Sequence, residues 1–215
     1  NELNTNLKIN LSNLKVENSD VKNFTNNNGR SNYEGSLKSI SRYKFSKIQN
    51  FDQYEPEIAI DKNNIIFFDN KGNILKFDSK AKLKWKKNNY SKTEKKMNPI
   101  LFFSTSKNYL IVADTVAKYY VLDISSGKII WSKNNSAPFN SQIKTFKDKF
   151  FIVDSENVIK CFSIKDGSVI WSFKTEKPFI KSQKKNSLVL KNNKVIFNNS
   201  LGDITALDLY TGDLV

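Results

Sequence analysis

The chain has 215 residues, of which 39% are apolar and 13% aromatic, so it has the composition of a globular protein with a sizeable core. Its formal net charge is +14, and it contains one cysteine, Cys161, and no histidine. These counts exclude Ser-His-Asp and Cys-His catalysis, an internal disulfide and a cysteine-rich zinc site within the chain.

The positive charge has a compositional explanation. The lysines are spread along the chain, and lysine, asparagine, isoleucine and phenylalanine are all over-used, which is typical of an AT-rich genome. We favour solvated surface lysines over a site for nucleic acid and expect no nucleic-acid partner. A basic module that binds anionic polymers or lipid stays open as an alternative function.

The first part of the chain differs in character from the rest. Residues 1–35 are polar and rich in asparagine, which predicts an irregular arm. Residues 36–48 contain a strand-like run, and residues 49–215 hold the main body of the chain. We therefore expect an arm, a short extended segment and one larger domain.

The larger domain is a repeat that begins at Pro56. Trp85, Trp131 and Trp171 end similar units and lie 46 and 40 residues apart. A fourth unit stops at Val215, one residue before its expected tryptophan. Periods of about 40 to 50 residues with several short strands each are typical of propeller blades.

Each unit is expected to contain four strands. In the first unit the apolar runs cover residues 57–60, 65–69, 73–77 and 82–86, and turn residues separate them. Four antiparallel strands stacked around an axis make a blade. The prediction is an all-β chain, a β-propeller that forms an open partial ring of about three complete blades and most of a fourth. The expected blades are residues 56–88, 99–134, 139–174 and, incomplete, 186–215.

Recurring Asp, Gly and Trp residues have structural roles in these units. An aspartate can accept backbone N–H bonds in the turn before the outer strand, and a glycine can take positive φ where that turn closes. The tryptophan then lies across the junction with the neighbouring blade. We assign blade-docking roles to Trp85, Trp131, Trp171, Asp123, Gly127, Gly167, Ala206, Asp208 and Gly212.

The repeat resembles a known family. The run Ala206-x-Asp208-x-x-Thr211-Gly212 resembles the tryptophan-docking repeat of the pyrroloquinoline-quinone (PQQ) propeller superfamily. Within it, residues 36–215 are most similar to the N-terminal half of the BamB family, the propeller lipoproteins of the bacterial β-barrel assembly machinery. The arm before the first blade, a strand at residues 41–47 that would complete the last blade, and blades without long insertions support this resemblance.

The resemblance implies a non-catalytic scaffold. Members of the family are eight-bladed periplasmic lipoproteins at the outer membrane, which dock on the barrel-inserting (BamA-like) channel protein through the loop after the third blade. Here that loop is residues 175–187, and it lacks the family's Ala-Pro turn, so a solvated connection is the competing interpretation. The resemblance implies no cofactor and no metal, a lipid anchor outside this chain as the only membrane contact, and unfolded outer-membrane proteins as further ligands. The implied partner-binding residues are Phe179, Ile180, Lys181, Ser182 and Gln183.

A PQQ-dependent dehydrogenase is the enzymatic alternative. Such an enzyme needs acidic and amide ligands for Ca²⁺ and residues that clamp the quinone. The sequence has no vicinal cysteines and no histidine, and its pattern indicates no inward-facing acidic cluster. We therefore predict that the chain is not an enzyme.

Overall fold

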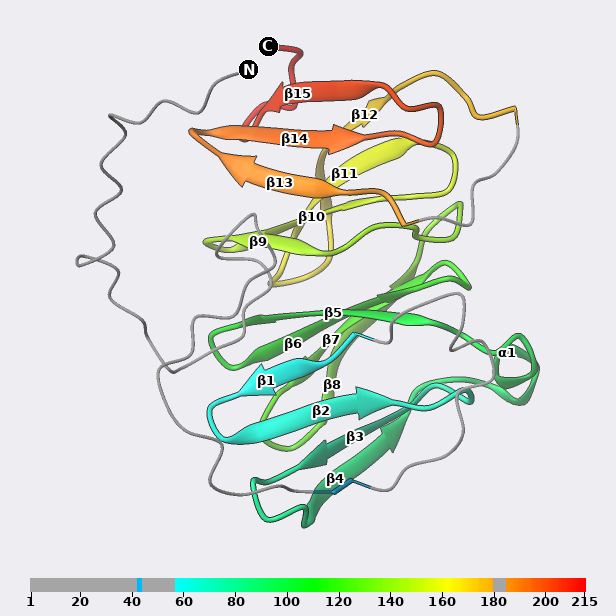
Figure 1. Cartoon of the computed structure of the whole chain (residues 1–215), viewed down its shortest axis with the longest axis vertical. Coiled ribbons are helices and arrows are strands. Elements are labelled where there is room, and N and C mark those ends of the chain that lie inside the picture. Colours follow the sequence, from blue (N-terminus) through cyan, green and yellow to red (C-terminus); the bar gives the residue numbers. More distant parts are fainter. Residues whose placement is uncertain (1–41, 44–56, 180–184) are drawn as a thin grey trace, which may run out of the picture.

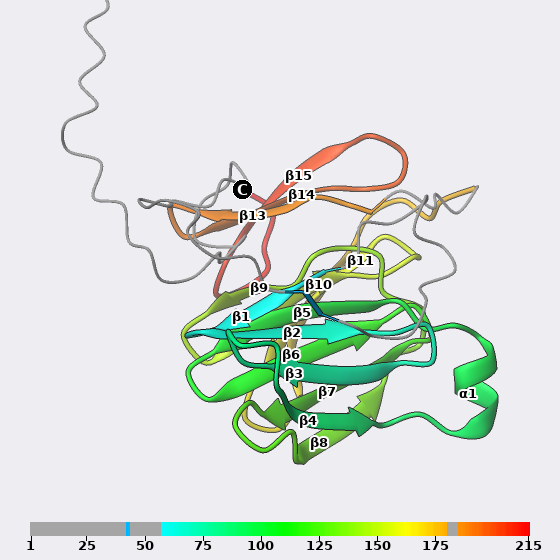
Figure 2. The same cartoon turned by 60° about the horizontal axis from the view of Figure 1, so that its bottom comes forward.

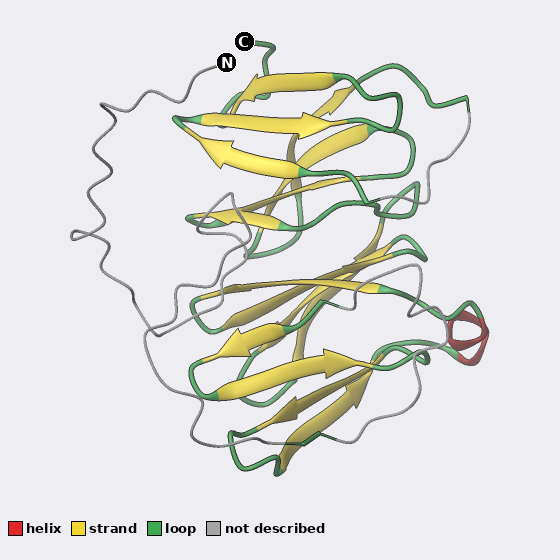
Figure 3. Cartoon of the chain, viewed as in Figure 1, coloured by secondary structure: helices red, strands yellow, loops and turns green. Residues whose placement is uncertain are grey.

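The computed structural model describes residues 42–43, 57–179 and 185–215. The expected arm and most of the expected strand at residues 41–47 lie outside these residues. The described part consists of strands joined by turns and loops, with one short helix (Figure 3). Its sheets stack as consecutive blades of an open arc (Figure 1), which confirms the predicted β-propeller class.

Each of the first three blades is a four-stranded antiparallel sheet, and the fourth has three strands. Blade 1 contains β1 (Ala59–Asp61), β2 (Asn64–Phe68), β3 (Asn73–Phe77) and β4 (Leu83–Asn88). Blade 2 contains β5 (Leu101–Ser106), β6 (Tyr109–Asp114), β7 (Lys118–Asp123) and β8 (Ile129–Asn134). Blade 3 contains β9 (Lys144–Phe146), β10 (Lys149–Val153), β11 (Val158–Ser163) and β12 (Val169–Lys174). Blade 4 contains β13 (Leu188–Lys191), β14 (Lys194–Asn198) and β15 (Ile204–Asp208).

Strands β1, β2 and β4 of blade 1 each differ by one or two residues at both ends from the runs read in the sequence. Strand β1 begins at Ala59 rather than at Glu57, because Glu57 leaves the ladder and its side chain reaches blade 2. Strand β4 continues to Asn88, because its pairing with β3 extends as far as Asn73. A helix, α1 (Lys92–Lys96), follows blade 1 and was not expected.

The middle strands of a blade are buried on both faces because a neighbouring blade lies on each side. Strands β6 and β10 are almost wholly buried, whereas the outer strands β4, β8 and β12 are largely exposed. Runs of apolar residues therefore suit the middle strands, and alternating lysines suit the outer ones. Because glycine is scarce, lysines take the positive-φ position of the inner hairpins: Lys62, Lys107 and Lys147 have φ of 54°, 52° and 54°.

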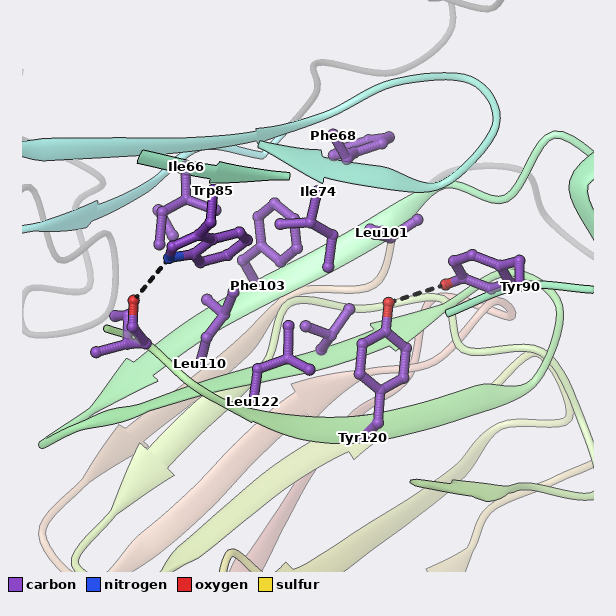
Figure 4. Close-up of a cluster of buried hydrophobic side chains, with 13 residues drawn as sticks. Ile66, Phe68, Ile74, Trp85, Tyr90, Leu101, Phe103, Leu110, Tyr120 and Leu122 are labelled. Carbon is purple, nitrogen blue, oxygen red and sulfur yellow. Dashed lines mark hydrogen bonds between the residues drawn. The ribbon is translucent and has the colours of Figure 1, made fainter. Parts of the chain in front are cut away.

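Three separate hydrophobic layers join the four blades. The layer between blades 1 and 2 includes Ile66, Ile74, Leu101, Leu110 and Tyr120, which interdigitate in Figure 4. The next layer is rich in aromatic rings and the third contains the free cysteine. Because each layer takes side chains from two blades, each blade depends on its neighbours for burial.

A β-bulge precedes the tryptophan of each outer strand. Trp85 lies opposite Lys76 and Leu83 lies opposite Phe77, so Lys84 is an extra residue in β4. The same shift occurs in β8 and β12, directly before Trp131 and Trp171. A bulge re-aims the side chain that follows it.

Each indole is anchored to the next blade by a hydrogen bond. Trp85 Nε1 donates to the carbonyl oxygen of Ile124 in blade 2, over 3.2 Å (Figure 4). The corresponding donor–acceptor distances are 2.9 Å for Trp131 to Ile164 and 3.2 Å for Trp171 to Leu209. The polar end of each indole is thereby satisfied, which the burial of Trp85 and Trp171 requires.

The turn glycine of the next blade lies directly against the indole. An added Cβ would come within 2.8 Å of Trp85 at Gly127, and within 2.6 Å of the preceding tryptophan at Gly167 and at Gly212. These glycines also have φ of 69°, 69° and 78°. The position therefore requires glycine for two reasons, the backbone angle and the close approach of the ring.

Aspartates stabilise the same turns. Asp123 Oδ1 accepts bonds from Ser125 and Ser126, and these bonds lower the pKa of Asp123 to about 2. Asp208 Oδ1 accepts the amides of Tyr210 and Thr211, and the pKa of Asp208 is likewise lowered by these backbone bonds.

Blade 3 and blade 4 fill the remaining turn positions differently. Blade 3 has Ser163 where Asp123 and Asp208 stand in their blades, and Asp166 accepts the Ser168 amide there over 3.1 Å. Ala206 pairs with Ile196 in the middle of blade 4 and is half-buried.

The double requirement at the turn glycine is testable with Gly167→Ala. We expect the variant to lower the free energy of unfolding by about 2 to 4 kcal/mol, because a methyl group would combine backbone strain with overpacking against Trp131. Gly202→Ala is the matched control, since Gly202 has φ of 98° but no atom within 4 Å of its added Cβ. Urea unfolding measures both variants, and equal losses would contradict the role of the indole.

Candidate partner-binding site

The propeller arc has two unlike faces. The inner and outer hairpin turns of every blade lie on one face, and the middle hairpins lie on the opposite one, together with the connections between blades (Figure 1). We call the second one the connection face: it comprises residues 69–73, 114–118, 154–158 and 199–203 of the middle hairpins and, of the connections, residues 89–100, 135–143, 175–179 and 185–187. The described ends of the predicted partner-binding loop, residues 175–179 and 185–187, belong to this face.

A buried carboxylate or amide organises each middle hairpin. The four residues Asp69, Asp114, Asp154 and Asn199 are at most 2% exposed. In each case Oδ1 accepts the backbone N–H groups two and four residues further along the chain, over 2.8 to 3.1 Å. This arrangement closes the turn by side-chain bonds, as is usual for Asp and Asn in turns.

The other side-chain atom reaches the connection that arrives from the preceding blade. Tyr90 donates its hydroxyl to Asp114 Oδ2 over 2.5 Å. Asn135 donates to Asp154 Oδ2 over 3.1 Å, and Asn199 donates to the Thr175 hydroxyl over 3.3 Å. The same position in blades 2, 3 and 4 therefore fixes the start of each connection.

The sequence carries a signal for this contact. The positions 69, 114, 154 and 199 are 45, 40 and 45 residues apart, close to the tryptophan period. Each position holds Asp or Asn at the end of an apolar run. Recurrence of a polar residue at a repeat period indicates a structural position, but its partners come from another blade and cannot be read from spacing.

Both ends of the connection 175–187 are anchored. Thr175 donates its amide and its hydroxyl to the Asn157 carbonyl oxygen, each over 3.2 Å. Asn157 is fully buried, and its side chain also bonds Glu176 and Ser200, so it joins blade 3, the connection and blade 4. At the far end the Asn186 amide donates to the Asn140 carbonyl oxygen over 2.8 Å.

Phe179 lies between these anchored ends, and its side chain is fully exposed, at 101% of its reference area. A fully exposed aromatic ring is unusual on a protein surface, because burial of such a ring is strongly favourable. The other predicted partner-binding residues, Ile180, Lys181, Ser182 and Gln183, lie outside the described residues.

An ion pair near the axis ties distant blades together. Glu57, ahead of blade 1, accepts the Phe103 amide of blade 2 over 2.8 Å and pairs with Lys185, ahead of blade 4. The Lys185 ammonium also lies 5.1 Å from the centre of the Phe102 ring. Nearby, burial lowers the pKa of Lys144 to about 8. These contacts cross the inside of the arc and join the segments ahead of blades 1 and 4 to blade 2.

A metal site, a reactive thiol and a membrane-spanning helix each place requirements on the described residues. Within the described ranges no cluster of three or more His, Cys, Asp or Glu residues is placed to hold a metal ion. Cys161 is buried, and burial raises the pKa of its thiol to about 12, so it acts as an apolar side chain. No helix in the described part of the chain has the length and apolar character needed to cross a membrane.

Comparison with known proteins identifies relatives of this arrangement. Residues 70–215 match the family described as outer membrane protein assembly factor BamB. No curated protein matches the chain.

Solved structures share the fold. BamB from Moraxella catarrhalis has a TM-score of 0.61 and 19% identity, over 74% of this chain and 47% of that one. A quinohemoprotein alcohol dehydrogenase from Comamonas testosteroni has 0.59 and 14%, over 75% and 34%. The computationally designed Ika4 protein has 0.55 and 15%, over 77% and 96%. The chain thus spans about half the length of the Moraxella protein, and at these identities the likeness concerns the fold.

The buried carboxylate of blade 2 makes a testable prediction about pH. Burial raises the pKa of Asp114 from its ordinary 3.8 to about 6, so the folded protein holds the proton more tightly than the unfolded chain. The resulting contribution to stability is full below pH 3.8 and is lost as the pH rises through 6. Asp114→Asn, which copies Asn199 of blade 4, should remove this dependence and stabilise the fold at pH 7 by up to about 3 kcal/mol.

Denaturant unfolding between pH 4 and pH 7 measures the effect. Asp114→Ala is the control: it also removes the titrating carboxyl, but it loses the bonds to Val116 and Lys118, so it should be about 2 kcal/mol less stable than the Asn variant at both pH values. An unchanged pH slope in the Asn variant would show that Asp114 does not titrate in this window.

Proposed function

The chain belongs to the family of the outer membrane protein assembly factor BamB, and from this premise we propose that it is a non-catalytic scaffold subunit of the outer-membrane protein assembly machinery. In this role it aids the insertion of β-barrel proteins by presenting its connection face to the barrel-inserting channel protein. The proposed location is the periplasmic face of the bacterial outer membrane, with a lipid anchor outside the residues given.

The exposure of Phe179 is the observation that carries the proposal. Exposed aromatic residues are frequent anchors of protein interfaces, because they bury a large apolar area at little cost in side-chain entropy. Phe179 occupies the connection after blade 3, the place that the family resemblance indicates for the partner. The fully exposed ring is available to a partner at that place.

The rigidity of the frame supports the same role. Asn157 and Thr175 fix the connection where it leaves blade 3, and Asn186 fixes it where it enters blade 4. A loop held at both ends loses less conformational entropy on binding than a free one, so more of its contact energy contributes to affinity. Blades 3 and 4 thus hold the two ends of the loop in fixed positions.

The exposed edges of the outer strands suit the second proposed class of ligand. Strands β4, β8 and β12 each have one unpaired edge in the described structure, as the outermost strands of their sheets. An extended segment of an unfolded outer-membrane protein could pair there by strand addition.

Isolation of the protein from its native membranes tests the proposed function. We expect the barrel-inserting channel protein to co-purify in stoichiometric amount, as identified by mass spectrometry. Bound quinone or calcium in the absence of the channel protein would favour the dehydrogenase alternative instead, and a quinone titration of the purified protein would then decide between them.

Substitution of the exposed ring tests the docking loop. We expect Phe179→Ala to weaken binding of the channel protein at least about tenfold, with an unchanged unfolding midpoint, because the ring makes no contact that the fold needs. Ile170→Ala is the matched control, since Ile170 is a 43% exposed apolar residue on the outer strand of the same blade. Equal binding by both variants would rule out Phe179 as an anchor.

A further inference from the structure

The connection between blades 1 and 2 contains an ordered helix that covers no part of the core. No residue of α1 (Lys92–Lys96) is buried. Tyr90 before the helix and Pro99 after it are both buried, and both pack over Gly72 of blade 1, where an added Cβ would lie 2.4 Å and 3.1 Å from their rings. The helix therefore rises from two buried residues and projects from the arc (Figure 2).

Several polar contacts hold this helix in place. Ser91 and Glu94 form a capping box, with the Ser91 amide donating to Glu94 Oε2 over 2.7 Å. Lys118 of blade 2 donates to Glu94 Oε1 over 2.9 Å and to the Asn89 carbonyl oxygen over 2.8 Å. A helix of five residues is unstable by itself, so these contacts fix its conformation.

The outward side of the helix is basic and carries one apolar side chain. Lys92 and Lys96 are exposed and Lys95 is half-buried. Glu94 is bound to Lys118, so it leaves these three lysines uncompensated within the helix. Met97, at the C-cap, is 60% exposed. Methionine is a flexible apolar side chain that adapts to varied partner surfaces.

We propose that α1 is a second docking element on the connection face and that it binds an acidic segment of the same partner that contacts Phe179. This inference rests on the proposed function. The positive charge of α1 is complementary to carboxylates in the partner, and Met97 is complementary to an apolar side chain next to those carboxylates. The ordered backbone means that binding costs little conformational entropy.

An acidic segment fits these features better than an extended anionic surface does. The uncompensated charges are confined to Lys92, Lys95 and Lys96, within a helix of five residues that is held away from the sheets. This small basic patch matches one segment of chain. Surface charges of this kind mainly speed association and select the partner, while the apolar contact slows dissociation.

The test compares two triple variants with the same loss of charge. Lys92, Lys95 and Lys96 become Gln in one, and Lys62, Lys107 and Lys147 become Gln in the other. The control lysines are exposed at the inner hairpin turns on the opposite face. Binding of the channel protein is measured as association and dissociation rates at low and high ionic strength.

We expect the α1 variant to bind about tenfold more weakly, mainly through slower association, and the control to stay within about twofold of the unsubstituted protein. The difference should shrink at high salt. Met97→Ala should speed dissociation about threefold. Thermal unfolding should be unchanged in the α1 variants, because no α1 residue and no Met97 side chain is buried.

Three results would overturn the inference while the proposed function stands. The α1 variant could bind as tightly as the unsubstituted protein, or both triple variants could weaken equally, which would show an effect of net charge alone. The α1 lysines could instead govern binding to vesicles of anionic phosphatidylglycerol and leave the channel protein unaffected. If the unsubstituted protein does not bind the channel protein at all, the proposed function fails, and this inference fails with it.

Discussion

The insertion of one blade's tryptophan against the turn glycine of the next is the contact on which the rest of the structure depends. Trp85, Trp131 and Trp171 each follow a β-bulge in their outer strand and donate a hydrogen bond to the following blade. The glycine has no side chain that would block the ring. Each contact of this kind sets the distance and the angle between two adjacent blades. Repetition of the contact therefore arranges the blades one after another along the arc.

A second repeated contact secures the opposite face. Asp114, Asp154 and Asn199 close the middle hairpins and bind the arriving connections, so every described junction is held on both faces. Rigid junctions leave the connections themselves free to vary without disturbing the blades. This division explains why exposed features such as Phe179 and α1 are found on connections, while the buried polar groups serve the fold.

The repeat and its strands could be predicted from the sequence, because apolar runs, turn residues and Trp spacing are local patterns. Helix α1 was missed, although Ser91 and Glu94 form the sequence signature of a capping box, because five residues give no helical period. The end of β1 was misjudged because Glu57 is drawn to an amide of blade 2. Such errors arise where the conformation of a residue is set by a partner that is distant in the sequence.

The sequence by itself determined the fold class, the four-unit repeat and the residue types of each turn, since these depend on neighbours within one unit. Only the tertiary structure showed the second reason why Gly167 must be glycine, which is the ring of Trp131 in another blade. The tertiary structure likewise showed that Asp114 is buried, that Phe179 is fully exposed and that no residue of α1 is buried. Which side chains are buried depends on how the blades pack against one another, and this cannot be read from the sequence of one repeat unit.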